Sequence, residues 1–301
     1  MPSAVTLLSW GGRAIRHTPP IHMVTALGLD PTSSVHIFAL CTAWTFLAIT
    51  LIWIIGLAQG NHSLIDGYYG FGFAIPAWIA YAVSGAASAT AAVLLVLTSL
   101  HGCRLGFYLT KRWWGYRRTT GGDQRYLGFR QKYAQGYWWK SLLIITEPQA
   151  LIIALIGLPA VIGIATLRTA DRPLNLLQCA GVLIFGIGFY FELVADGQLQ
   201  AFKADPHNKG RYLRTGVWTH TRHPNYFGNC TVWWGIWVVA VAASPALWWT
   251  ILSPLFNTLM LTSLFGRALQ DELMGKRPEY QQLMRETSSF LPLPRSRPPP
   301  T

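Results

Sequence analysis

Apolar stretches recur along the chain at lengths that suit membrane-spanning helices. About 20 nearly uncharged residues, at 1.5 Å of rise each, cross a hydrocarbon core about 30 Å thick. Seven such stretches are present, at residues 35–57, 64–83, 87–109, 141–167, 174–194, 224–243 and 246–265. The pattern therefore predicts an all-α, multi-pass integral membrane protein of about seven transmembrane helices, in a bacterial inner membrane or the endoplasmic reticulum.

The stretches outside these spans divide the chain. Residues 1–34 form a mixed N-terminal segment without the basic start, short apolar core and cleavage site of a signal peptide. Residues 293–301 form a proline-rich tail whose composition predicts disorder. A single membrane domain over residues 35–292 is expected between them.

Charge supports the membrane class and predicts an orientation. Charged residues make up 12% of the 301 residues, against about 25% in soluble proteins. Residues 111–140, 203–222 and 266–301 hold 8, 5 and 6 Lys or Arg, together 19 of the 24. Because cytoplasmic loops collect Lys and Arg, we expect these segments and the C-terminus in the cytoplasm and the N-terminus on the other side. The same rule explains most of the net charge of +12, so no nucleic-acid partner is expected.

The string "THTRHPNYFGN", residues 219–229, concentrates polar side chains where a span begins. Pro224 suits the first turn of a helix, and a residue before proline, here His223, is pushed out of helical geometry. Arg222 would then stand at the mouth of the span, with Asn225 and Tyr226 in its first turn. A helix start binds phosphate well, although an interfacial cap with one positive Arg is the simpler alternative.

The preceding span extends this candidate site. Glu192, Asp196 and Lys203 lie at i, i+4 and i+11, close to one helix face. Glu192 falls inside the apolar run, where a carboxylate marks either function or a structural pair with an Arg of the cytoplasmic loops. Four basic residues, Lys203, Lys209, Arg211 and Arg214, could neutralise phosphates, or could follow the positive-inside bias alone.

Two further acids lie at membrane depth. Asp66 is followed by Tyr68 and Tyr69, and Glu147 precedes a proline. A carboxyl group in an apolar pocket can stay protonated and donate to a substrate carbonyl beside a tyrosine hydroxyl. The alternative for Asp66 is that it caps the start of its span.

The segment after the last span adds Arg267, Asp271 and Tyr280. Arg267 and Asp271 are four residues apart, which also fits a plain surface salt bridge. The chain has no Rossmann fingerprint and no P-loop, so any nucleotide would bind among helix ends. Its four cysteines show no metal-ligand spacing, and no metal site is expected.

These blocks together resemble the C-terminal superfamily of the steroid 5-alpha-reductases, in its branch of membrane reductase-like proteins. The resemblance covers roughly residues 35–292 and is carried by "SLIDGYYGFGF", "RLGFYLTKRWWGYRRTTGGDQRY", "DGQLQAFKADPHNKGRYLRTGVWTHTRHPNYFGN" and "PEYQQLMRETSSFLPLPR". It implies NADPH bound in a cytoplasm-facing cavity of residues 174–292, and hydride transfer to an enone or related activated double bond of a lipidic substrate drawn from the membrane. The matching positions for the cofactor are Asp196, Lys203, Trp218, Arg222, His223, Asn225, Tyr226, Arg267, Asp271 and Tyr280. Glu192 and Arg211 are added to these cofactor candidates from the residue pattern alone.

The sequence departs from the family pattern at two places. Asn229 stands where members commonly have an acid, and the second span lacks the Gln-Glu pair with which steroid reductases hold a 3-keto group. Asp66, Tyr68, Tyr69 and Glu147 are the candidates for the proton donor instead.

Two other functions fit parts of the sequence. Isoprenylcysteine and lipid methyltransferases resemble the same C-terminal block but use S-adenosylmethionine. A non-catalytic lipid-binding or transport protein is the other rival, and transporters often show internal repeats that this chain lacks.

Overall fold

The protein is all-helical wherever its structure is described. A computed structural model describes residues 24–120, 123–169, 172–264 and 266–294. Within these ranges the regular elements are all helices, and the one β-type contact is an isolated bridge between Thr221 and Ser288. The expected all-α class is confirmed. Residues 1–23 of the N-terminal segment and 295–301 of the tail lie outside the described residues.

The helices follow one another with short connections. In chain order they are α2 (Ser34–Gln59), α3 (Leu64–Ser84), α4 (Ala89–Thr120), α5 (Gln124–Lys132), α6 (Tyr137–Ser141), the π-helical η2 (Leu142–Thr146), α7 (Glu147–Thr166), α8 (Leu176–Ala204), the 3₁₀ helices η3 (Pro206–Asn208) and η4 (Gly216–Thr219), α9 (Pro224–Ala243), the 3₁₀ helix η5 (Pro245–Ile251), α10 (Leu252–Leu259), the π-helical η6 (Met260–Leu264), α11 (Arg267–Met274) and α12 (Pro278–Glu286).

Five helical stretches in the described part are long and apolar enough to cross a membrane. They are α2, α4, the continuous unit from α6 to α7, α8 and α9. The expected second span corresponds to α3, and the expected seventh is divided into η5, α10 and η6. Neither is among the five, so the structure supports a multi-pass membrane protein, while seven spans and the orientation of the termini stay predictions.

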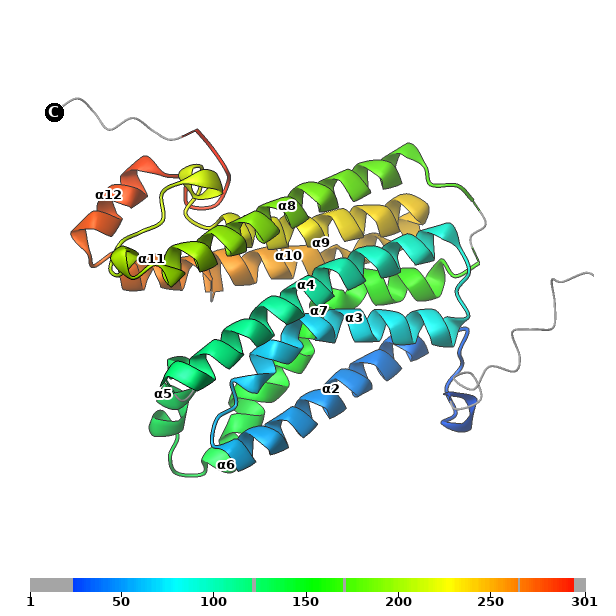
Figure 1. The fold of residues 1–301 in the computed structure, drawn as a ribbon. Coiled ribbons are helices and arrows are strands. Elements are labelled where there is room, and N and C mark those ends of the chain that lie inside the picture. Colours follow the sequence, from blue (N-terminus) through cyan, green and yellow to red (C-terminus); the bar gives the residue numbers. More distant parts are fainter. Residues whose placement is uncertain (1–23, 121–122, 170–171, 265, 295–301) are drawn as a thin grey trace, which may run out of the picture.

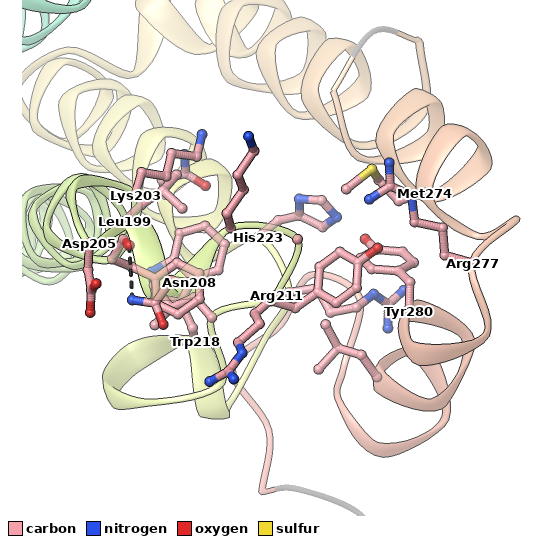
Figure 2. Close-up of a pocket in the computed structure, with 18 of the residues that line it drawn as sticks. Leu199, Lys203, Asp205, Asn208, Arg211, Trp218, His223, Met274, Arg277 and Tyr280 are labelled. Carbon is pink, nitrogen blue, oxygen red and sulfur yellow. Dashed lines mark hydrogen bonds between the residues drawn. The ribbon is translucent and has the colours of Figure 1, made fainter.

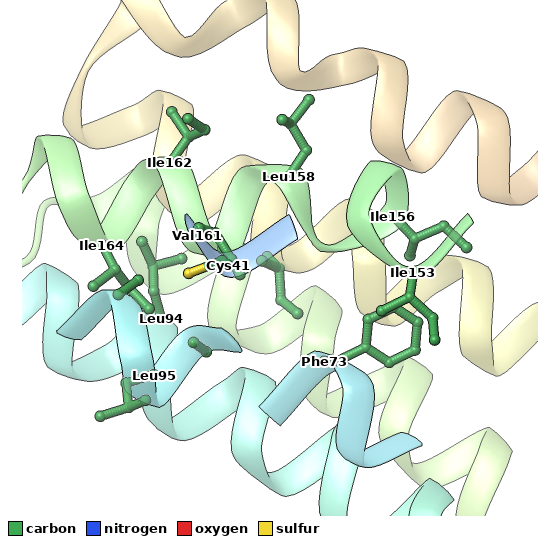
Figure 3. Packing of buried hydrophobic residues seen from close by; sticks show 14 of the residues in the cluster. Cys41, Phe73, Leu94, Leu95, Ile153, Ile156, Leu158, Val161, Ile162 and Ile164 are labelled. Atoms are coloured by element: carbon green, nitrogen blue, oxygen red, sulfur yellow. The ribbon is translucent and has the colours of Figure 1, made fainter. Parts of the chain in front are cut away.

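The apolar core centres on α7. Every residue of its second half from Ile156 to Ala165 is buried, as expected for a helix that is apolar on all sides. Figure 3 shows Ile153 beside Phe73 of α3, and Ile164 near Leu94 of α4. α7 therefore lies inside the bundle, with α2, α3, α4 and α9 in contact with it.

α8 and α9 form the tightest helix pair, and glycine makes this approach possible. A Cβ atom on Gly188 of α8 would lie 2.6 Å from the backbone nitrogen of Val232 and 2.7 Å from the carbonyl oxygen of Gly228. Backbones can pack this closely only where side chains are absent. The pairing fixes the end of α8 relative to the start of α9. Figure 1 shows α11, α12 and the loop after α8 gathered at this end of the bundle.

Candidate functional site

A cavity of about 720 Å³ lies where the C-terminal end of α8 meets the start of α9. Residues of α11, α12 and the segment between them close its other side. Figure 2 shows Lys203 on the α8 side, Arg277 and Tyr280 on the opposite side, and His223 between them. Nine residues singled out in the sequence line this cavity: Lys203, Lys209, Arg211, Trp218, Arg222, His223, Asn225, Tyr226 and Tyr280.

The start of α9 has the predicted geometry. α9 begins at Pro224, and His223 precedes it with φ −136° and ψ 57°, outside the helical region. This arrangement turns Asn225 and Tyr226 of the first helical turn to the cavity wall. The prediction drawn from the His-Pro pair is confirmed.

Arg222 is held by residues from the C-terminal part of the chain. Its Nη2 lies 2.8 Å from Oδ2 of Asp271 and its Nε 3.3 Å from Oδ1. Its Nη1 donates to the carbonyl oxygens of Thr287 (2.5 Å) and Met284 (3.3 Å). The backbone N–H of Arg222 donates to the carbonyl oxygen of Ser288 (2.9 Å). Four of the five guanidinium N–H donors are thus engaged. Arg222 shapes the cavity by joining α9 to the α11–α12 region, and offers little of its charge to a ligand.

Asp271 is the centre of this junction. Besides Arg222 it accepts from the hydroxyl of Tyr280 (2.6 Å), and it lies 3.3 Å from Nε2 of His223. Burial favours the neutral carboxyl group, but the hydrogen bonds from His223, Arg222 and Tyr280 outweigh it and hold the pKa of Asp271 well below its usual value. Burial and the neighbouring carboxylate raise the pKa of Tyr280. The His223 ring also stacks parallel to Tyr226, with 5.3 Å between centroids.

The loop between α8 and α9 is anchored to α8. The indole Nε1 of Trp218 donates to the carbonyl oxygen of Ala195 (3.1 Å), and the backbone N–H of Val217 donates to Oε1 of Gln198 (3.1 Å). Gly216 has a φ of +63° and lies so close to the Gln198 amide that a Cβ there would collide with it. The role of Trp218 is therefore to hold this wall of the cavity.

The remaining basic residues of the lining are unpaired. The side chains of Lys203, Lys209, Arg211 and Arg277 make no hydrogen bond or ion pair with any residue that the structure describes. Asp205 is the one acid among the described residues of the lining. Four free cations around one cavity favour an anionic ligand, and Arg matches the geometry of phosphate oxygens.

A buried polar network connects the cavity to the membrane interior. Arg104 of α4 contacts both acids of α8: its Nη1 lies 2.6 Å from Oδ2 of Asp196, and its Nη2 pairs with Oε1 of Glu192. Asn225 donates from Nδ2 to Oδ1 of Asp196 (3.3 Å). Glu192 thus pairs with an arginine, Arg104, that belongs to a membrane helix. The structural pair considered from the sequence placed this arginine in a cytoplasmic loop instead.

The network continues deeper on Glu192. Its Oε2 lies 3.0 Å from Nδ1 of His101, and its Oε1 accepts from Nδ2 of Asn229 (3.1 Å). Asn229 in turn accepts from Asn257 of α10 (3.0 Å). An acid at position 229 would face the Glu192 carboxylate, whereas the amide can donate to it. The amide therefore suits the network of this chain.

His101 and Arg104 were not singled out by the sequence argument. A signal was available, because both are ionisable residues inside an apolar span and lie three residues apart on one helix face.

Asp66 lies in a separate ion-pair cluster. Its Oδ2 is 2.7 Å from Arg125 and 3.1 Å from Arg112, and its Oδ1 accepts from the hydroxyl of Tyr126 (2.6 Å). It belongs to the first turn of α3 and joins α3 to α4 and α5.

The other expected proton donors also lie away from the cavity lining. Glu147 accepts from the hydroxyl of Thr50 (2.7 Å), directly after the π-helical η2. Pro148 has no N–H to continue the helical ladder, which accounts for the irregular turn. Tyr68 and Tyr69 pack against the apolar core. The structure brings none of these residues to the cavity.

Arg267 likewise falls outside the cavity lining. It donates from Nε to the carbonyl oxygen of Thr262 (3.0 Å) and from Nη1 to the hydroxyl of Ser289 (3.0 Å). The expected partner four residues on, Asp271, is bound to Arg222 instead.

Together, the fold and the site define a multi-pass helical membrane protein with a cationic cavity at one end of its bundle. The chain belongs to a family described as "Protein of unknown function (DUF1295)", whose model matches residues 52–287. That match includes the residues that line the cavity and the buried network. No curated protein and no solved structure matches the chain.

Proposed function

We propose that the protein is an NADPH-dependent membrane reductase that saturates an activated C=C bond of a steroid-like or other lipidic substrate, similar to the steroid 5-alpha-reductases. One observation carries this proposal. The cavity at the start of α9 is bordered by four cations, on three different segments, that have no hydrogen-bond or ion-pair partner in the described part of the chain, which is an arrangement suited to several separate phosphates.

The residues present fit the cofactor. NADPH carries a pyrophosphate and a third phosphate on its adenosine ribose, so cations on opposite walls can each meet one of them. Lys203 comes from α8, Lys209 and Arg211 from the loop, and Arg277 from the segment before α12. The start of α9 adds the positive end of a helix dipole.

S-adenosylmethionine fits this cavity less well. It has no phosphate and carries a positively charged sulfonium group, which four unpaired cations repel. The methyltransferase alternative is therefore the rival that a binding experiment should include.

The chain's own residues would divide the work of reduction. NADPH, when bound, would supply a hydride for the β-carbon of the substrate. The C=C electron pair would shift to the bond between the α-carbon and the carbonyl carbon, the C=O pair would move to the oxygen to give an enolate, and a proton would then be added at the α-carbon. Tyr226 is the cavity-lining tyrosine on the helix that continues into the membrane, from which a lipidic substrate arrives. We assign the proton-donating role to Tyr226, ahead of Asp66, Tyr68, Tyr69 and Glu147, because it borders the cavity. A positioned acid typically contributes about 10² to 10⁴ in rate.

Cofactor binding tests the first half of the proposal. Purified protein in detergent is titrated with NADPH and, separately, with S-adenosylmethionine, and the heat of binding is measured by isothermal titration calorimetry in both cases. NADPH should bind, and Lys203→Ala and Arg277→Ala should each weaken it about tenfold or more, since each removes a charged hydrogen bond. Lys276→Ala is the matched control, because Lys276 is exposed and adjacent to Arg277 but does not line the cavity.

Two results would contradict the cofactor assignment. One is a wild-type protein that binds S-adenosylmethionine and not NADPH, and the other is full NADPH affinity in both cavity variants.

A second experiment tests the reaction itself: NADPH oxidation is followed with a panel of apolar enones. Tyr226→Phe should lose most of the turnover while keeping NADPH affinity. If Asp66→Asn lost most of the turnover and Tyr226→Phe lost none, the proton donor would be Asp66.

A further inference from the structure

One face of α4 changes from apolar to cationic as the helix leaves the membrane. Phe107, Lys111, Trp114 and Arg118 follow each other at spacings of four, three and four residues, which places them on one side of the helix. Phe107 is 66% and Trp114 48% exposed, and both basic residues are exposed as well. Toward the membrane interior the same helix exposes Leu100 and Val96. We call the four residues from Phe107 to Arg118 the α4 stripe.

The cations of the α4 stripe differ from their neighbours in having no hydrogen-bond or ion-pair partner among the residues that the structure describes. Arg112 pairs with Asp66 (3.1 Å), and Arg117 donates to Oε1 of Gln59 (2.6 Å). Lys111 makes no side-chain hydrogen bond or ion pair within the described part of the chain, and the Arg118 guanidinium lies over the Trp114 ring, 4.9 Å from its centroid. Two of the four cations at this helix end thus serve the fold, and the two on the stripe remain available.

The topology places the α4 stripe at a membrane boundary. The span of α4 ends at Thr119, and the next span begins at Tyr137, so the chain leaves and re-enters the membrane at the same end of the bundle. Exposed Trp138 and Trp139 mark this boundary on the second span. Long Lys and Arg side chains at such a position reach toward the head groups while their stems cover apolar surface.

We propose that the α4 stripe is a binding site for an anionic glycerophospholipid. An acyl chain lies along Phe107 and the apolar face that precedes it, and the lipid phosphate is held between Lys111 and Arg118. The two cations are about 10 Å apart along the axis, a gap that their flexible side chains close around one phosphate. Trp114 lies between them at the depth of the glycerol backbone, where its ring is half in apolar and half in polar surroundings. This site is independent of the cofactor cavity and of the proposed reaction.

Native mass spectrometry of the full chain in detergent micelles doped with phosphatidylglycerol or phosphatidylcholine tests the site. The wild type should retain phosphatidylglycerol in preference to phosphatidylcholine. Lys111→Gln and Arg118→Gln should each weaken that retention about fivefold, and the double variant about 25-fold. Lys111→Arg with Arg118→Lys keeps both charges and should retain the lipid.

Controls separate the site from net charge and from free anions. Lys276→Gln with Arg285→Gln removes two exposed charges elsewhere on the chain and should leave retention unchanged. Equal loss in that control, or full retention in the double variant of the stripe, overturns the proposal. Displacement of the lipid by inorganic phosphate would also overturn it, because the site would then bind a free anion. The altered side chains are exposed, and an unchanged melting temperature verifies that each variant is folded.

Discussion

Arg222 and Asp271 form a two-point ion pair that joins the start of α9 to α11, with 2.8 Å between Nη2 and Oδ2 and 3.3 Å between Nε and Oδ1. Their side chains are 5% and 14% exposed. Removing one partner of such a pair leaves a buried charge without compensation. The pair is therefore a structural requirement of the cavity, formed between segments 49 residues apart.

Asp271→Asn should lower the free energy of unfolding by about 3 kcal/mol, because Arg222 loses the opposite charge that compensates its burial. The midpoint of thermal unfolding in detergent measures the loss. Glu272→Gln is the control, since Glu272 is the adjacent exposed acid and should have little effect. Similar melting temperatures for Asp271→Asn and the wild type would show that the pair is dispensable.

His62 should make the protein less stable in mild acid. It is buried between α2 and α6, with Nδ1 2.8 Å from the hydroxyl of Tyr137. Burial, followed by the positive charge of Arg130, lowers the pKa of His62 from 6.5 to about 4. The unfolded chain therefore takes up a proton between about pH 6.5 and about pH 4 while the folded protein does not, so stability falls as the pH falls through this window.

The expected result is a melting temperature that declines between these two pH values in the wild type and declines less in His62→Gln. Unfolding is followed in detergent at a series of pH values, at constant ionic strength. A His62→Gln profile parallel to that of the wild type would exclude His62 as the source of the dependence.

Replacing Arg104 should lower the free energy of unfolding more than replacing Glu192, one of the two acids that it contacts. It is the guanidinium that faces two buried carboxylates, so Arg104→Met leaves Glu192 with His101 alone and Asp196 with no ion-pair partner among the described residues. We expect a loss of about 3 to 5 kcal/mol. Glu192→Gln leaves one carboxylate for one guanidinium and should cost clearly less. Thermal unfolding of the two variants side by side gives the order, and a larger loss in Glu192→Gln would contradict this account of the network.

Gly188 and Gly186 provide a matched pair on α8. A Cβ on Gly188 would meet the α9 backbone at 2.6 Å, whereas nothing lies within 4 Å of a Cβ on Gly186. Gly188→Ala should therefore force α8 and α9 apart and cost about 1 to 3 kcal/mol, and Gly186→Ala should be neutral or stabilising by up to about 1 kcal/mol. Melting temperatures test the contrast. Because the α8–α9 pair positions the cavity, Gly188→Ala should also weaken NADPH binding, and equal behaviour of the two variants would refute the close contact.

Local patterns were sufficient for most of the long helices and for the part of the site at the start of α9. The run of apolar residues that begins at Pro224 and ends at Ala243 coincides with α9, and the His-Pro pair gave its first turn. These features depend on residues close together in sequence, through proline geometry and the length of apolar runs. The grouping of Lys203, Arg211, Asn225 and Tyr226 around one cavity was also expected.

Local sequence patterns could not predict which acidic residue pairs with which basic residue. Spacing suggested that Asp271 pairs with Arg267, but it binds Arg222, and Glu192 binds Arg104 and His101 of a different membrane helix. Asp66 likewise joins Arg112 and Arg125.

The sequence by itself determined that this is a helical membrane protein with a basic segment, residues 203–222, that leads into α9. Only the tertiary structure decided which basic residues are free for a ligand and which are consumed by the fold, because that depends on how α4, α8, α9 and α11 pack against one another. Hydrophobic periodicity is a property of neighbouring residues, whereas an ion pair between helices depends on the distance and burial that packing creates.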